Sequence, residues 1–150
     1  MEYRNDKGKP VANNYYEGIL QIRNPTKAIL KVARKMIENK KRMFIAKQIK
    51  VRNGYDFYLS SQKIMRHIGN DLQTRFGGQT KISKKLHTVN KQSGKRVYRV
   101  TMLFRLYNLK VGDVVRAGAK FMKITRLGRR VYGIDIEKNR QISVDYDKIR

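Results

Sequence analysis

The sequence contains no cysteine, and only 11 of its 150 residues are acidic. A chain without cysteine forms no disulfide, binds no zinc through thiolates and has no cysteine nucleophile. The N-terminal segment is polar and lacks the apolar core of a signal peptide. No strongly apolar run approaches the roughly 20 residues that span a membrane. We therefore expect a cytoplasmic protein with no membrane partner.

The scarcity of acids leaves a large positive charge. Lysine and arginine number 36, so the formal net charge is +25. Charge of that size repels itself unless a polyanion neutralises it, whereas solubility needs only about 2 to 8 charges on a small domain. Nucleic acid is the favoured polyanion, and an anionic membrane surface is the second candidate. A hydrophobic content of 40% is sufficient for a packed core, so we do not expect wholesale disorder.

Patterns that indicate catalysis are also lacking. His67 and His87 are interpreted as surface or packing residues rather than as bases. The pair Ser60-Ser61 has no triad pattern nearby, and Gly77-Gly78 follows a helix instead of opening a phosphate-binding loop. A loose acidic set near the C-terminus can hold a cation or balance neighbouring arginines, and we favour charge balance for Asp135, Glu137, Asp145 and Asp147. We expect no enzyme, no catalytic residue, no metal site and no cofactor.

The rest of the chain is organised around residues 80–106, which we interpret as a long β-hairpin. Two strand-like arms flank a polar turn at 90–95, and residues of the second arm alternate with period two. One set in that arm is Tyr98, Val100, Met102, Phe104 and Leu106, and the other is Val97, Arg99, Thr101, Leu103 and Arg105. In the first arm Ile82, Leu86 and Thr88 oppose Lys81, Lys85 and His87. One face is therefore expected to bury a core while the other presents cations.

Upstream of the hairpin the sequence predicts an arm, three strands and two helices. Residues 1–13 are interpreted as a flexible arm and 15–23 as a strand. Asn24-Pro25-Thr26 opens a helix, with Asn as N-cap and Pro at the first helical position, that ends near Asn39. Strands at 43–51 and 55–60 are joined by Arg52-Asn53-Gly54, a strong hairpin signal. A second helix, 62–76, is capped by Ser60 or Ser61 and ended by Gly77-Gly78.

This order predicts an α+β fold in which two helices cover one face of an antiparallel sheet. Short strands broken by glycine turns then predict a small all-β barrel at 110–150. We therefore expect three parts: an arm at 1–13, an RNA-binding α+β domain at 14–109 and the barrel. The barrel carries 11 basic and 5 acidic residues, a net +6, against 25 and 6, a net +19, for residues 1–109.

The candidate RNA contacts are cations clustered in strands and turns, where they can bind phosphates without reading sequence. One cluster follows the first helix, where cations also suit the helix dipole. A second group of cations lies in the 52–54 turn and along the long hairpin, and a third group lies in a turn of the barrel. For each group the alternative is a charged face that only contacts solvent. Tyrosines on the strands can stack bases, although half-buried packing is their commoner role. The candidates are Lys40, Lys41, Arg42, Arg52, Lys81, Lys84, Lys85, Lys91, Lys95, Arg96, Arg99, Arg105, Arg126, Arg129 and Arg130.

Several fragments together resemble the Nmd-three family, the large-subunit ribosome assembly and export adaptor. They are Y-Y-E-G-I-L-Q-I-R-N-P (15–25), N-G-Y-D-F-Y-L-S-S (53–61), L-H-T (86–88), K-R-V-Y-R-V-T-M-L-F-R-L (95–106) and V-G-D-V-V (111–115). Their order and spacing also match, over about residues 15 to 150. Family members begin with cysteine-rich zinc modules, which this sequence lacks, so we expect the later domains alone: a split gene, a truncated paralogue or a fragment. The nuclear transport signals of eukaryotic members would lie beyond Arg150, so the chain resembles archaeal-type members more closely.

The resemblance implies binding to ribosomal RNA (rRNA) at the intersubunit face of the large ribosomal subunit. Ribosomal proteins near the E site and other assembly factors are the further partners that it implies. It also implies that the barrel is similar to the translation factor five A module, near the E site. The alternatives are a permanent structural protein of the large subunit and, from another class, an RNA-processing enzyme, against which the missing catalytic groups argue.

Overall fold

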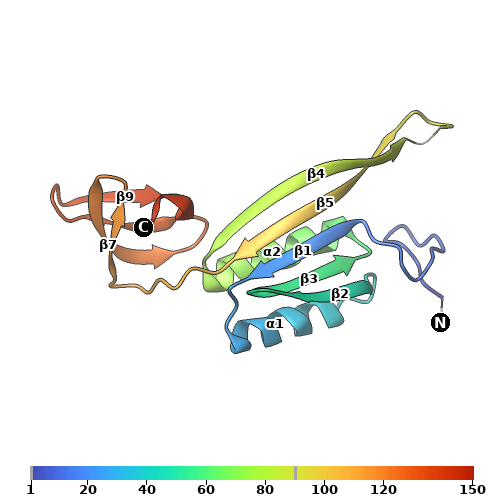
Figure 1. Ribbon diagram of the computed structural model, residues 1–150, viewed down its shortest axis with the longest axis horizontal. Coiled ribbons are helices and arrows are strands. Elements are labelled where there is room, and N and C mark those ends of the chain that lie inside the picture. The colour runs from blue at the N-terminus through green and yellow to red at the C-terminus, as the bar shows by residue number, and fades with distance from the viewer. Residues whose placement is uncertain (1, 90) are drawn as a thin grey trace.

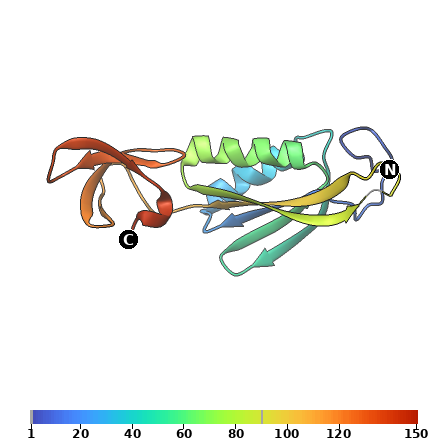
Figure 2. The same cartoon turned by 90° about the horizontal axis from the view of Figure 1, so that it is seen from above.

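The first part of the chain forms a five-stranded sheet with both helices on one face (Figures 1 and 2). The structure, a computed structural model, describes residues 2–89 and 91–150. The strand order is β2-β3-β1-β5-β4. In chain order the elements are β1 (Gly18–Arg23), α1 (Lys27–Glu38), β2 (Ile45–Val51), β3 (Gly54–Leu59), α2 (Gln62–Phe76), β4 (Gln79–Val89) and β5 (Arg96–Arg105).

The central strand β1 pairs in two directions. It is antiparallel to β3 but parallel to β5, with Gly18 opposite Val100 and Arg23 opposite Arg105. The α+β class is therefore confirmed, whereas the expected purely antiparallel sheet is wrong. Helix α2 carries the chain from β3 to the far edge, so that β4 runs back beside β5 and β5 runs in the same direction as β1. Period-two alternation predicts the buried face of a strand but not its neighbours.

Both helices start at a hydroxyl cap. The Ser61 hydroxyl accepts the Ile64 amide at 3.2 Å, which confirms one of the two expected caps of α2. In α1 the cap is Thr26, whose hydroxyl accepts the Ile29 amide at 3.1 Å, and not Asn24 as the sequence suggested. Asn24 instead takes a left-handed conformation, with φ +55°, and its amide bonds to the Asn53 carbonyl of the β2–β3 turn. The tertiary contact to that turn moves the helix start two residues along the chain.

The core lies between the helices and the sheet. Leu20, Ile22, Phe57, Met102 and Phe104 are fully buried on the sheet side. Each helix contributes an apolar stripe at helical spacing, with Ile29, Ala33, Ile37, Met65, Ile68 and Leu72 buried. Gly69 allows α2 to approach β5 closely, because a Cβ there would lie 2.5 Å from the Met102 sulfur. A side chain at this position would require the flexible end of Met102 to move.

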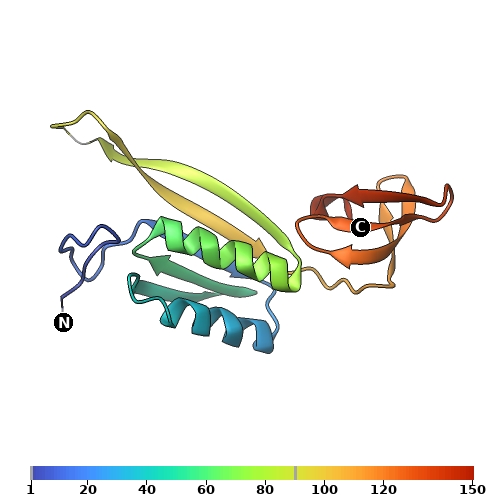
Figure 3. The same cartoon turned by 180° about the vertical axis from the view of Figure 1, so that it is seen from behind.

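The β4–β5 hairpin extends beyond this core (Figures 1 and 3). In β5 the expected burial of Val100, Met102 and Phe104 is confirmed, whereas Tyr98 of the same set is 37% exposed. In β4 the expected burial is wrong, since Ile82 is 50% and Leu86 48% exposed. Strand β4 is the edge of the sheet, and its distal part runs past the helices, so its apolar side chains have no layer to pack against. The expected turn at 90–95 begins at Asn90, which is outside the described residues.

The C-terminal part forms a second, antiparallel sheet of order β6-β7-β8-β9. Its elements are β6 (Val114–Ala117), β7 (Lys120–Leu127), β8 (Val131–Asp135), β9 (Arg140–Val144) and the short 3-10 helix η1 (Tyr146–Lys148). Met122, Ile124, Val131 and Tyr146 form its core. Among the described residues no ladder joins β9 to β6, so the expected barrel is instead an open sheet. An isolated bridge between Ala117 and Ile149 connects the end of β6 to the C-terminal segment.

Tyr146 joins the two sheets. It is 2% exposed, its hydroxyl donates to the Gly128 carbonyl at 2.7 Å, and it accepts the Gly78 amide at 2.8 Å. Burial raises the pKa of this phenol, so the hydroxyl keeps the proton that it donates. Its ring also lies 5.1 Å from that of Tyr107, which in turn donates to Gln79 at the start of β4. The second sheet is therefore fixed to the end of α2 and the beginning of the hairpin.

The N-terminal segment contacts the opposite end of the first sheet (Figure 1). The ring of Tyr3 lies 4.9 Å from that of Phe44, and the Asp6 carboxylate accepts the Ser61 hydroxyl at 3.2 Å. A bridge between Arg4 and Pro10 closes a small loop within the segment. The expected flexibility of this arm stays a prediction.

Truncation of Phe104 to alanine should destabilise the protein strongly. The side chain is fully buried at the centre of the first core, and such a change typically costs about 3–5 kcal/mol. We expect the melting temperature in a circular-dichroism scan to fall by on the order of 10 °C. Val97→Ala on the same strand is the control, because Val97 is 43% exposed. Equal shifts for the two variants would contradict the assigned faces of β5.

Removal of the Tyr146 hydroxyl should loosen the junction. In Tyr146→Phe the Gly78 amide loses its acceptor within a buried contact, at a cost of about 1–3 kcal/mol. Amide hydrogen exchange should then be faster at Gly78 and in the Gly128 turn, while α1 keeps its protection. Uniform acceleration over the whole chain would show instead that Tyr146 stabilises both sheets as one cooperative unit.

Candidate nucleic-acid interface

The face of the first sheet opposite the helices carries the expected cations. Pairing places Lys85 opposite Arg99 and Gln79 opposite Arg105, so Lys81, Lys85 and Arg105 share the open face and are exposed. The edge strand β4 adds charge on the other face, where Lys84 lies opposite the buried Val100 but is itself exposed. The predicted basic surface therefore covers both faces of the projecting hairpin rather than one.

The hairpin tip presents three further cations. Lys91, Lys95 and Arg96 are exposed in or beside the turn, where the sequence placed them. Residues 79–106 contain no acidic residue to neutralise them. A two-stranded ribbon with cations on both faces and at its tip has the charge and shape to contact phosphates.

Arg99 has a partner inside the protein. Its guanidinium lies 4.0 Å from the centre of the Tyr16 ring and donates to the Tyr16 hydroxyl at 2.9 Å. Tyr16 packs edge-on against Tyr58, whose ring in turn lies 5.4 Å from the Lys47 ammonium. Arg99 therefore acts first as a packing residue, and the row from Arg99 to Lys47 extends the basic surface across the open face. Lys47 was missed from the sequence, because its parity in β2 is that of Ile45 and Ile49 and gave no signal of a separate basic face.

The other first-sheet candidates lie away from the hairpin. Lys40, Lys41 and Arg42 are exposed between α1 and β2, and Arg52 is exposed in the β2–β3 turn. Strand β2 is the opposite edge of the sheet from β4, so these groups do not join the hairpin surface. Lys41 and Arg42 instead line an open hollow with residues 2–8 of the N-terminal segment.

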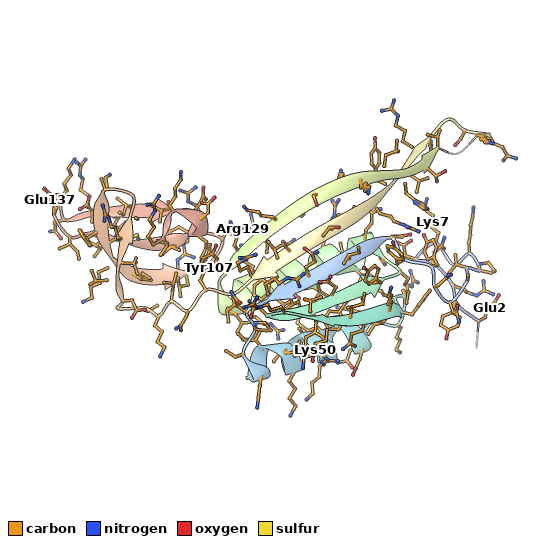
Figure 4. The ribbon with its side chains drawn as sticks, viewed as in Figure 1. Glu2, Lys7, Lys50, Tyr107, Arg129 and Glu137 are labelled. Carbon is orange, nitrogen blue, oxygen red and sulfur yellow. The ribbon has the colours of Figure 1, made fainter. Side chains whose placement is uncertain are left out.

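Three candidate arginines lie at the end of β7 and in the β7–β8 turn, in different situations. Arg126 stacks on the Tyr132 ring at 3.9 Å. Arg130 forms an ion pair with Asp145 at 3.2 Å and donates to the Ser143 carbonyl, which matches the expected charge balance. Arg129 is exposed and follows Gly128, the Tyr146 partner, so it lies beside the junction (Figure 4). The junction thus places this turn near the Gln79–Arg105 end of the hairpin.

Several carboxylates have structural partners. Asp135 is buried and accepts the amides of Glu137 and Lys138, and Asp56 pairs with Arg23 at 2.7 Å. Glu17 accepts the Gln62 amide at the start of α2 and the Tyr15 hydroxyl; burial first, and then this bond, raise the pKa of Tyr15. Within residues 2–89 and 91–150 there is no group of three metal-ligating side chains, and no helix long and apolar enough to cross a membrane.

RNA binding by this surface should depend strongly on salt. If about six phosphates are neutralised, the logarithm of the binding constant should fall with the logarithm of salt concentration at a slope of roughly −4 to −5. Replacing Lys91, Lys95 and Arg96 by alanine should make the slope less negative by about 2 to 3, with an unchanged circular-dichroism spectrum because the three lie at an exposed turn. Fluorescence anisotropy with an rRNA fragment, repeated over a range of salt concentrations, measures the slope for the unmodified chain and for the variant. A slope near zero for the unmodified chain would refute the electrostatic surface.

The fold and the basic surface are consistent with what comparison with known proteins finds. No curated protein matches the sequence. The sequence profile of the second domain of NMD3 matches residues 15–106, which run from the segment before β1 to the end of the β4–β5 hairpin. This match covers more than half of the chain and includes every element of the first sheet. The resemblance expected from the sequence is thereby confirmed: the chain belongs to the NMD3 family.

Proposed function

We propose that this protein is a non-catalytic rRNA-binding factor of the large ribosomal subunit. On this proposal it acts at the intersubunit face near the E site, in assembly or in occupancy of the subunit. The observation that carries the proposal is the NMD3 match over residues 15–106. The family is a ribosome assembly and export adaptor, so membership links the chain to biogenesis of the large subunit.

The charge distribution supports RNA as the direct ligand. The hairpin places exposed cations on both faces and at its tip, with no acid between residues 79 and 106. Such a ribbon suits structured RNA, where phosphates approach a protein element from more than one side. Sequence-specific readout is not required, because position on the subunit can be set by shape and charge.

The junction supports a two-part contact. Tyr146 ties the Gly128 turn to Gly78 at the start of the hairpin, so the second sheet stays close to the first. With restricted relative motion, binding of one part raises the effective concentration of the other. In the proposed mechanism the first sheet binds rRNA while the second reaches toward the E site and excludes deacylated tRNA by occupying its space. Release then depends on another factor, or on competition by tRNA or the small subunit.

A cryo-EM map of the purified chain on large ribosomal subunits tests this placement. We expect density on the intersubunit face, with the β4–β5 hairpin against rRNA and the second sheet nearest the E site. Charge-reversed Lys91→Glu/Lys95→Glu/Arg96→Glu is the matched control and should give subunits without this density. Density over a solvent-side rRNA helix, with an empty E site, would overturn the proposed mechanism.

Sucrose-gradient fractionation of cells separates a factor from a permanent ribosomal protein. A factor should be substoichiometric, sediment with free large subunits and be absent from translating polysomes. A permanent structural protein would follow polysomes at full occupancy.

A further inference from the structure

The outer face of the second sheet carries exposed apolar side chains that no core explains. Phe121 in β7 is 56% exposed, Ile136 51% and Val114 57%. Pairing places Arg116 opposite Phe121, and the Ile136 amide donates to the Phe121 carbonyl, so these residues are cross-strand neighbours. They point away from the core formed by Met122 and its neighbours, because side chains alternate along a strand.

Cations are interleaved with this apolar patch. Arg116 and Lys123 are exposed on the same face, Lys123 standing opposite Val114 and two residues from Phe121. Further along, the face continues to Arg126, stacked on Tyr132 across the β7–β8 ladder. The stripe thus offers a bare aromatic ring at one end, a guanidinium plane on a ring at the other, and positive charge between them. Tyr132 lies opposite Arg126, and Ile136 lies opposite Phe121. These two residues are four positions apart, so at about 3.3 Å per residue the ends of the stripe are about 13 Å apart.

We infer that this stripe, defined by Phe121, Lys123, Arg126 and Tyr132 with Arg116 and Ile136 beside it, is a binding site for single-stranded RNA. An unpaired base stacks on Phe121, and a second base, a few nucleotides along, stacks on the free side of the Arg126 guanidinium. Aromatic rings and arginine planes on a sheet surface are the usual stacking partners of unpaired bases. Lys123 and Arg116 neutralise the phosphates between the two bases. The inference rests on the proposed function only in taking RNA as the polyanion.

Charge decides between RNA and a protein as the occupant. A docking surface for an apolar protein segment would be depleted of charge at its centre, whereas here Arg116 and Lys123 flank the exposed ring. The nearest acidic residues are not on this stripe. Asp135, the last residue of β8, is buried and accepts the Glu137 amide, and Glu137 lies beyond the end of β8 (Figure 4). The stripe therefore complements an anion that also has flat apolar faces, which describes a nucleotide.

The chain contains no tryptophan, so a single substitution gives a local probe of stacking. In Phe121→Trp, titration of the full chain with an oligouridylate of about eight nucleotides should quench the tryptophan fluorescence, since sheet-based single-strand sites span about 4–16 nucleotides. Asn70→Trp, on the exposed side of α2, is the matched control and should change little. Phe121→Ala should weaken oligouridylate binding about 5- to 100-fold by anisotropy, and Phe121→Tyr should restore it.

The outcomes separate this inference from the proposed function. Unchanged oligouridylate affinity in Phe121→Ala, or no quenching in Phe121→Trp, would overturn the single-stranded site even if the unmodified chain binds large subunits. Loss of subunit binding in Phe121→Ala with intact oligouridylate affinity would assign the stripe to a ribosomal protein and likewise overturn it. If the unmodified chain fails to bind subunits, the proposed function fails, and the oligouridylate titration still decides the stripe.

Discussion

The parallel pairing of β1 with β5 is the interaction on which the basic surface depends. Strand β1 is bonded on both edges, and its Leu20 and Ile22 are fully buried beneath the helices. Without this ladder β4 and β5 would form an isolated two-stranded ribbon, which is marginal in water. The ribbon also contains no acid, so its cations repel one another. Anchoring its proximal half in a core is what allows the distal half to project with its charge unneutralised.

The same arrangement explains why one hairpin has two kinds of surface. Near the core, Val100, Met102 and Phe104 fill the space under α2. On the edge strand and toward the hairpin tip, the same alternation leaves Ile82, Leu86 and Tyr98 exposed beside the lysines. Exposed apolar groups among cations are suited to RNA, whose sugars and bases offer apolar contact between phosphates. The projecting end therefore exposes cations and apolar groups together, whereas the anchored end serves stability.

Tyr146 gives the two sheets a common frame. Its hydroxyl accepts the Gly78 amide just before β4 and donates to the Gly128 carbonyl in the β7–β8 turn. Its ring packs against Tyr107 in the segment between β5 and β6. Gly77 permits this approach, since it has φ +70° and a Cβ there would lie 2.9 Å from Leu127. The Arg129 turn is consequently held near the base of the hairpin. On the outer face of the second sheet, Phe121 lies at the end of the stripe that is farther from Arg126. The distance between the two is set by the residues of the β7–β8 ladder between them.

The sequence by itself determined the element types, the buried parity of β5, two candidate caps for α2, the candidate cations and the family, because periodicity, turn chemistry and charge are local properties. Tertiary structure decided the rest. It paired β1 with β5 in parallel, moved the α1 cap to Thr26, and left the apolar residues of β4 exposed. It also gave Arg99 and Arg130 internal partners and placed Phe121 beside Arg116. Each of these depends on which segments become neighbours, and that choice is made by the energy of the whole packed chain rather than by any local pattern.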